Sequence, residues 1–149
     1  MNRKMLLLPL LCTAFLAGCE RDYMSEVGFS LPAGDPAAGE EAFVYMQCNE
    51  CHTVKGLDLP RVPLADPPFV ELGGNVTKVK TYGDLVTSII NPSHKLAKGY
   101  PVDEIAVDGE SLMRNYNRVM TVQELIDIVM FLQPHYDVVI PYHAYPTYH

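Results

Sequence analysis

Three segments of the chain repeat apolar positions at the spacing of an α-helix. They span residues 35–46, 81–91 and 121–134, and the third is apolar on most of its sides, which predicts a helix buried on most of its surface. Each segment opens on a residue that can cap a helix, and Pro36 adds a proline at a first helical position. No segment alternates convincingly between apolar and polar positions, so the pattern predicts an all-α fold with three main helices. The capping residues are Asp35, Thr81 and Thr121.

The segments that join these helices are predicted to be loops. Residues 53–80 are rich in proline, and residues 92–120 contain several turn sequences. Helices and loops together predict one small domain over residues 35–134, followed by a tail at 135–149 that is rich in Tyr, His and Pro. That tail is interpreted as an extended strap over the domain, with a docking or metal-binding segment as the alternative.

The most informative chemistry follows directly after the first predicted helix. Cys48-Asn49-Glu50-Cys51-His52 has the C-x-x-C-H spacing of a c-type haem attachment site. Two thiols one turn apart can each add to a vinyl group of the haem, and His52 then lies under the iron as an axial ligand. A thiol–disulfide redox motif and half of a zinc site are the other interpretations. The first expects a βαβ context and the second expects another ligand pair, and the sequence indicates neither.

The N-terminus has the pattern of an export signal. Two basic residues precede an apolar stretch over residues 5–15, which is too short to span a bilayer. The stretch ends in Leu16-Ala17-Gly18-Cys19, which resembles a bacterial lipoprotein box. This resemblance implies that residues 1–18 are removed and that Cys19 is acylated. An ordinary signal peptide with an incidental cysteine is the alternative.

Lipidation at Cys19 would place the protein on the periplasmic side of a bacterial membrane, because several acyl chains on one residue hold a protein there. Residues 19–34 then form a tether between the lipid and the domain. Of the four cysteines, Cys12 leaves with the signal and two carry the haem, so none remains for a disulfide.

The order of these features resembles that of class I monohaem cytochromes c over residues 35–134. The resemblance implies a small fold wrapped around one covalent haem c, in which the first and last helices pack through a glycine and aromatic side chains. It also implies that Pro67 accepts a hydrogen bond from the His52 ring, and that Tyr82 or Arg61 donates to the haem propionates. The residues in the helix-packing positions are Gly39, Phe43, Ile128 and Phe131.

The same resemblance implies that Met113 is the sixth iron ligand. This residue lies in an irregular loop before the last helix, and Arg114 stands where the family has a proline. The alternatives are Met120, which abuts the cap of the last helix, His94, which follows the middle helix, and an open site. The candidates for an apolar pocket around the iron are Leu112, Ile126 and Val129.

The charge of the chain bears on its partners. The formal net charge is −7, and loss of the two basic residues of the signal moves it to −9. This acidity argues against nucleic acid and favours redox protein partners with a basic docking patch. The features together predict a membrane-anchored carrier of single electrons rather than an enzyme. The alternatives are a haem subunit of a periplasmic dehydrogenase complex and a haem-based redox or gas sensor with a displaceable sixth ligand.

Overall fold

The computed structural model describes residues 31–60 and 69–139. Several sequence predictions lie outside these residues: the signal at 1–18, the lipidated Cys19, most of the tether, Arg61, Pro67 and the end of the tail. None of the helices in the described ranges is long and apolar enough to cross a membrane.

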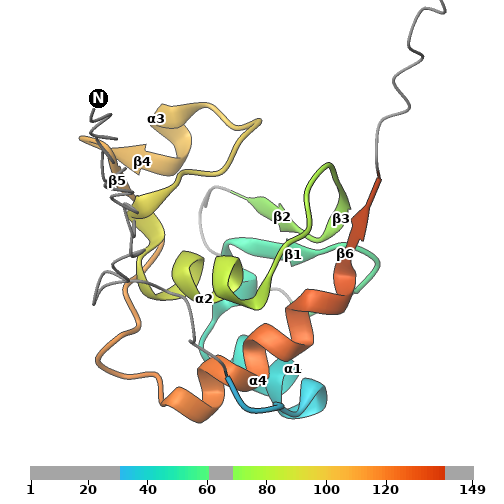
Figure 1. The fold of residues 1–149 in the computed structure, drawn as a ribbon. Helices are drawn as coiled ribbons and strands as arrows, with labels where there is room; N and C mark the ends of the chain where they lie inside the picture. Colours follow the sequence, from blue (N-terminus) through green and yellow to red (C-terminus); the bar gives the residue numbers. More distant parts are fainter. Residues whose placement is uncertain (1–30, 61–68, 140–149) are drawn as a thin grey trace, which may run out of the picture. The chain divides into compact units, whose positions relative to one another are not determined.

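Four α-helices organise the described domain (Figure 1). Their bounds are α1 (Pro36–Tyr45), α2 (Tyr82–Ile90), α3 (Val102–Ile105) and α4 (Val122–Leu132). Short 3-10 turns follow three of them, namely η1 (Cys48–Glu50), η2 (Pro92–His94) and η3 (Gln133–His135). The three predicted helices are therefore confirmed, and α3 is a single turn inside a segment that was predicted to be a loop.

The predicted caps explain where the three longer helices begin. The Asp35 carboxylate accepts hydrogen bonds from the backbone N–H groups of Ala37 and Ala38, at 2.9 and 3.3 Å. Helices α2 and α4 each begin with a complete capping box, in which a threonine hydroxyl and a carboxylate three residues later satisfy each other's backbone N–H groups. The two boxes are Thr81 with Asp84 and Thr121 with Glu124.

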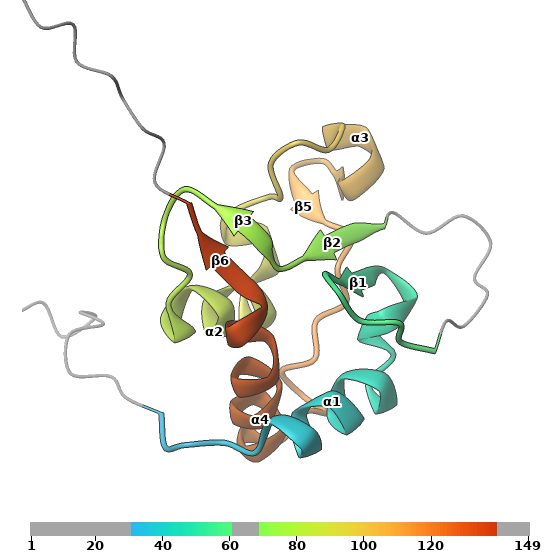
Figure 2. The same cartoon turned by 90° about the vertical axis from the view of Figure 1, so that its right-hand side faces the viewer.

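Helices α1 and α4 pack directly against each other, as Figure 1 and Figure 2 show from two sides. A Cβ atom on Gly39 would lie 2.0 Å from the backbone oxygen of Asp127, so only a glycine permits this approach. Phe43 and Phe131 pack against each other beside it as a tilted pair, with ring centroids 5.7 Å apart. Ile128 is buried in the same core. The contact thus uses the glycine and the aromatic side chains that the sequence indicated.

The prediction of an all-α fold is wrong, because in the described residues six short strands pair in three small sheets. Strands β1 (His52–Val54) and β2 (Val70–Leu72) are parallel, as are β3 (Gly74–Val76) and β6 (Tyr136–Val138). Strands β4 (Ala106–Val107) and β5 (Glu110–Ser111) form an antiparallel hairpin. The fold is therefore mixed α/β. Strands of two or three residues are too short to produce an alternating pattern, and both parallel pairs join segments far apart in sequence.

The start of the predicted tail belongs to the packed domain. Residues 133–135 continue from α4 as η3, and β6 then pairs with β3 along the register Gly74 to Tyr136 (Figure 2). Tyr136 also packs against the hydrophobic core. The core consists of Phe43, Val54, Leu85, Val86, Ile128, Val129, Phe131 and Leu132.

Candidate cofactor-binding site

One large cavity, with a volume of about 740 Å³, lies among α2, β2, β3 and the segment before α4. This volume is in the range of sites that hold cofactors and other drug-sized molecules, about 300–1,000 Å³. Its wall includes Cys48, Cys51, His52 and Met113, which come from two parts of the chain. The structure therefore brings the four predicted haem-site residues of the domain to one cavity.

The turn after α1 presents the two cysteines. Gln47 has a left-handed backbone conformation, with φ of 60°, which ends the helix and opens η1. The backbone N–H of Cys51 then donates to the carbonyl of Cys48 at 3.3 Å. Both thiols are free, and both line the cavity. The turn thus places two thiols, three residues apart in the sequence, at the wall of the same cavity.

Burial keeps these thiols protonated in the folded chain. It raises the pKa of Cys48 to about 11, and a hydrogen bond from the backbone opposes this only in part. Burial also raises the pKa of Cys51, and the negative charge of Glu50 adds to that effect. A protonated thiol is a weak nucleophile, so neither cysteine has the environment of a reactive thiolate.

His52 is held by strand pairing. In the register of β1 and β2 it lies opposite Val70, and its Nδ1 is 3.1 Å from the Val70 carbonyl oxygen. A carbonyl can only accept a hydrogen bond, so Nδ1 carries the hydrogen. Burial lowers the pKa of the ring, although the hydrogen bond to Val70 acts in the opposite direction. The neutral ring therefore keeps a free lone pair on Nε2, as a metal ligand requires.

The hydrogen bond from His52 corrects one residue assignment. Pro67 was expected to accept the ring N–H, and it lies outside the described residues, whereas the described acceptor is the carbonyl of Val70. A partner of this kind fixes the tautomer and the orientation of a ligating imidazole. Within the described residues, the carbonyl of Val70 is the group that can restrain His52 in this way.

The segment that carries Met113 is held by backbone hydrogen bonds at residues 111–113. The backbone N–H of Ser111 donates to the Ser93 hydroxyl at 3.0 Å, and that of Leu112 donates to the Ile105 carbonyl at 2.9 Å. The Met113 N–H itself donates to the Ser111 hydroxyl at 3.2 Å. Hairpin β4–β5 and turn η2 therefore position this methionine at the cavity.

The alternative sixth ligands lie elsewhere. His94 is exposed, its Nδ1 is 2.7 Å from the Asn91 carbonyl oxygen, and it does not line the cavity. Met120 packs against the hydrophobic core instead. Among the three candidate side chains, Met113 is the one at the cavity wall.

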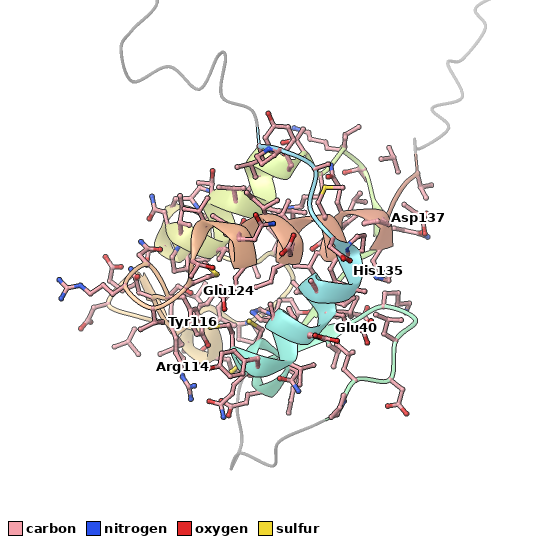
Figure 3. All side chains as sticks on the ribbon, turned by 90° about the horizontal axis from the view of Figure 1, so that it is seen from below. Glu40, Arg114, Tyr116, Glu124, His135 and Asp137 are labelled. Atoms are coloured by element: carbon pink, nitrogen blue, oxygen red, sulfur yellow. The ribbon has the colours of Figure 1, made fainter. Side chains whose placement is uncertain are left out.

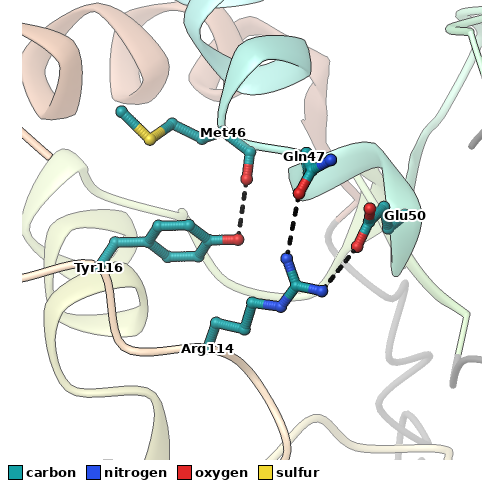
Figure 4. Close-up of polar contacts among 5 residues, drawn as sticks. All are labelled: Met46, Gln47, Glu50, Arg114 and Tyr116. Atoms are coloured by element: carbon teal, nitrogen blue, oxygen red, sulfur yellow. Dashed lines mark hydrogen bonds and ion pairs between the residues drawn. The ribbon is translucent and has the colours of Figure 1, made fainter. Parts of the chain in front are cut away.

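Two polar side chains just after Met113 reach back to the cysteine turn, and sequence reasoning missed both contacts. Arg114 bonds to Glu50 and Gln47, and the Tyr116 hydroxyl donates to the Met46 carbonyl at 2.8 Å (Figure 4). Figure 3 shows Arg114 and Tyr116 together beside the end of α1. The sequence shows a basic residue at position 114, but its neighbours in the sequence do not indicate that it pairs with Glu50 and Gln47.

The remaining cavity wall combines apolar side chains with a basic rim. Leu112 lines the cavity as predicted, together with Leu85, Ile89, Ile105 and Leu132. Ile126 and Val129 do not, because α4 turns them into the packed interior. Tyr82 also lies outside the cavity wall. The basic residues at the wall are Lys78, Lys80, Lys95, Lys98 and Arg114.

Two further observations complete the description of the site. Across residues 31–60 and 69–139, no three His, Cys, Asp or Glu side chains are grouped in the manner of ligands for a free metal ion. Comparison of the chain with family models, with curated proteins and with solved structures finds no match. The function is therefore inferred from the residues that line the cavity.

Proposed function

We propose that the protein is a class I c-type cytochrome that carries single electrons. One observation supports this above all others: two free thiols, a neutral imidazole and a thioether line a single cavity of cofactor size. This donor set fits haem c, with Cys48 and Cys51 as the covalent attachment points and His52 and Met113 as the axial ligands. When bound, the haem supplies reversible one-electron chemistry at its iron.

The residues of the chain then have separate tasks. Cys48 and Cys51 retain the group covalently, and Val70 fixes the ring that offers Nε2. The Met113 thioether is a soft donor that favours a high reduction potential, and the apolar wall favours the less charged ferrous state. No side chain is required to transfer a proton or to form a bond with a substrate, so the proposed protein is not itself an enzyme.

The proposal also covers the location and the partners of the protein. An acylated Cys19 would anchor the exported domain to the periplasmic face of a bacterial membrane. The net charge of −9 after removal of the signal favours redox protein partners with a basic docking patch. Residues 102–111, which form α3 and the β4–β5 hairpin, expose four acidic side chains and contain no basic one, which suits such a patch. The four are Asp103, Glu104, Asp108 and Glu110.

The test is an absorption spectrum of the haem-matured protein, oxidised and then reduced, compared with Met113→Ala. We expect a low-spin c-type spectrum with the far-red ferric band of sulfur ligation, and we expect Met113→Ala to lose that band. Met120→Ala is the matched control and should retain it, because Met120 packs in the core. A high-spin wild type that binds carbon monoxide at once would favour a sensor or a catalytic haem subunit instead.

A further inference from the structure

We propose that Arg114 is a positioning residue that holds Met113 toward the haem iron through its ion pair with Glu50. This inference rests on the proposed function, because it assigns a role in axial ligation to a side chain next to the ligand. The resulting contact joins the segment that carries the thioether to the turn that carries both haem thiols.

The geometry of the contact is that of a two-point clamp (Figure 4). The Nη2 of Arg114 lies 3.0 Å from Oε2 of Glu50, and Nη1 lies 3.3 Å from Oε1 of Gln47. The guanidinium is rigid and planar, so two bonds from its two nitrogens fix its direction as well as its position. A single bond to a flexible side chain would leave the segment free to rotate.

The burial of the two partners differs, and this difference makes the contact strong. The Glu50 side chain is 5% exposed, whereas that of Arg114 is 57% exposed. A buried carboxylate without a counter-charge is costly, so Glu50 restrains the arginine more firmly than a surface carboxylate would. Glu50 is also part of the turn between Cys48 and Cys51, which the attached haem would make still more rigid.

A second bond reinforces the clamp. The Tyr116 hydroxyl donates to the Met46 carbonyl at 2.8 Å, so residues 114 and 116 are both tied to the segment 46–50. Met113 itself has only a local backbone hydrogen bond, to the Ser111 hydroxyl. Movement of its thioether away from the cavity therefore works against the bonds of its neighbours, and loss of those bonds should make the sixth ligand easier to displace.

The experiment measures how readily added imidazole replaces the sixth ligand in ferric protein. The variant is Arg114→Gln, and the matched control is Arg118→Gln, which removes the same charge from an exposed residue of the same segment. We expect Arg114→Gln to bind imidazole about tenfold more tightly than wild type, because loss of the charge-assisted bond to Glu50 frees the segment that carries Met113. The far-red ferric band should weaken in parallel, Arg114→Lys should restore part of it, and Arg118→Gln should match wild type.

A second variant separates positioning from folding. Arg114→Gln leaves Glu50 buried and unpaired, so the double variant Arg114→Gln with Glu50→Gln removes both charges together. We expect the double variant to unfold near the wild-type temperature and still to bind imidazole more tightly. Wild-type imidazole affinity and an intact far-red band in both folded variants would overturn the inference. A wild type with covalent haem but no sulfur band would overturn Met113 ligation and this inference with it, while absence of covalent haem would overturn the proposed function itself.

Discussion

Gly39 leaves no room for a side chain where α1 crosses α4. An added Cβ would lie 2.0 Å from the Asp127 carbonyl oxygen and 2.8 Å from the Phe131 Cβ, and both neighbours belong to a packed helix. We expect Gly39→Ala to destabilise the haem-loaded protein by about 2–3 kcal/mol, because the two helices must separate to accept the methyl group. Urea unfolding measures the loss.

The matched control for that substitution is Gly83→Ala in α2. The nearest atom to a Cβ at this position is the Thr81 hydroxyl at 3.7 Å, which is ordinary contact. This variant should be unchanged or stabilised by about 0.4–1 kcal/mol, because alanine restricts the unfolded chain. Because alanine forms helices better than glycine, helix propensity cannot destabilise either variant, and equal destabilisation of both would contradict the assignment of the loss to the crossing.

Single residues were predictable where their chemistry is local. The spacing of Cys48, Cys51 and His52 indicated a shared site, and the structure brings them to one cavity with Met113. The acceptor for His52 could not be read from the sequence in the same way, because it is a backbone carbonyl chosen by the register of two parallel strands. The partner of Arg114 is likewise set by tertiary structure.

At the scale of elements, the capping box of α4 makes stability depend on pH. Hydrogen bonds from the backbone N–H and the hydroxyl of Thr121 lower the pKa of Glu124 from its ordinary value of 4.5. A lowered pKa means that the carboxylate stabilises the fold above about pH 4.5, and that this contribution disappears as the pH falls toward the folded-state pKa. We expect Glu124→Gln to lower the free energy of unfolding by only about 0.3–0.5 kcal/mol at pH 7, because glutamine can still complete the capping box and solvent screens this exposed carboxylate.

Thermal or urea unfolding at several pH values checks this prediction. The difference between wild type and Glu124→Gln should shrink steadily as the pH falls below about 4.5. Glu40→Gln provides the control, since Glu40 is an exposed carboxylate within α1 and outside any capping box (Figure 3). A difference that stays constant down to pH 3 would contradict a stabilising role for the ionised carboxylate.

The helices were predictable because each of the three longer ones carries its own start signal, at Asp35, Thr81 and Thr121. The strands carry no such signal. Residues 106–111 form a hairpin around Asp108 and Gly109, both with positive φ, but its strands are only two residues long. The pairing of β3 with β6 joins two segments on either side of α4 in the chain, and only packing brings them together.

For the whole molecule, the cavity predicts that folding depends on the bound group. The wall of the 740 Å³ cavity includes the apolar side chains of Leu85, Ile89, Ile105 and Leu132. Water wets these side chains unless a bound group covers them, and a domain of this size buries little other apolar surface to compensate. We expect Cys48→Ala with Cys51→Ala, which cannot attach haem covalently, to lose helical circular dichroism and cooperative unfolding.

Met113→Ala serves as the comparison, because it keeps both thiols and should retain the haem and most of the helical signal. A double cysteine variant with wild-type helicity and a sharp unfolding transition would show that the domain folds without a filled cavity. The prediction that folding depends on the bound haem would then be wrong, and the proposed attachment of haem at Cys48 and Cys51 would be unaffected.

The distribution of charge is a property of the whole molecule that net charge alone does not reveal. Four lysines line the cavity, whereas the charged side chains of residues 102–111, which form α3 and the β4–β5 hairpin, are all acidic. The formal net charge of −7 should steer cationic partners, and the acidic segment 102–111 should be where they dock. We therefore expect electron exchange with a cationic ruthenium hexaammine probe to slow as salt is added, and exchange with ferrocyanide to speed up.

Two pairs of substitutions locate that docking surface. Glu104→Gln in α3 with Glu110→Gln in the hairpin (together the hairpin variant) removes two charges from segment 102–111, and Glu40→Gln with Glu41→Gln (the α1 variant) removes two from exposed positions of α1. At low salt the hairpin variant should react about threefold more slowly with the cationic probe, and the α1 variant should change little, because Coulomb attraction weakens with distance and is screened. Equal slowing in both variants would mean that net charge alone governs the encounter. A different result would place docking at the lysines of the cavity wall. In that case exchange would be faster with ferrocyanide than with the cationic probe, and replacement of Lys95 and Lys98 would abolish the difference. The partner would then have to be acidic.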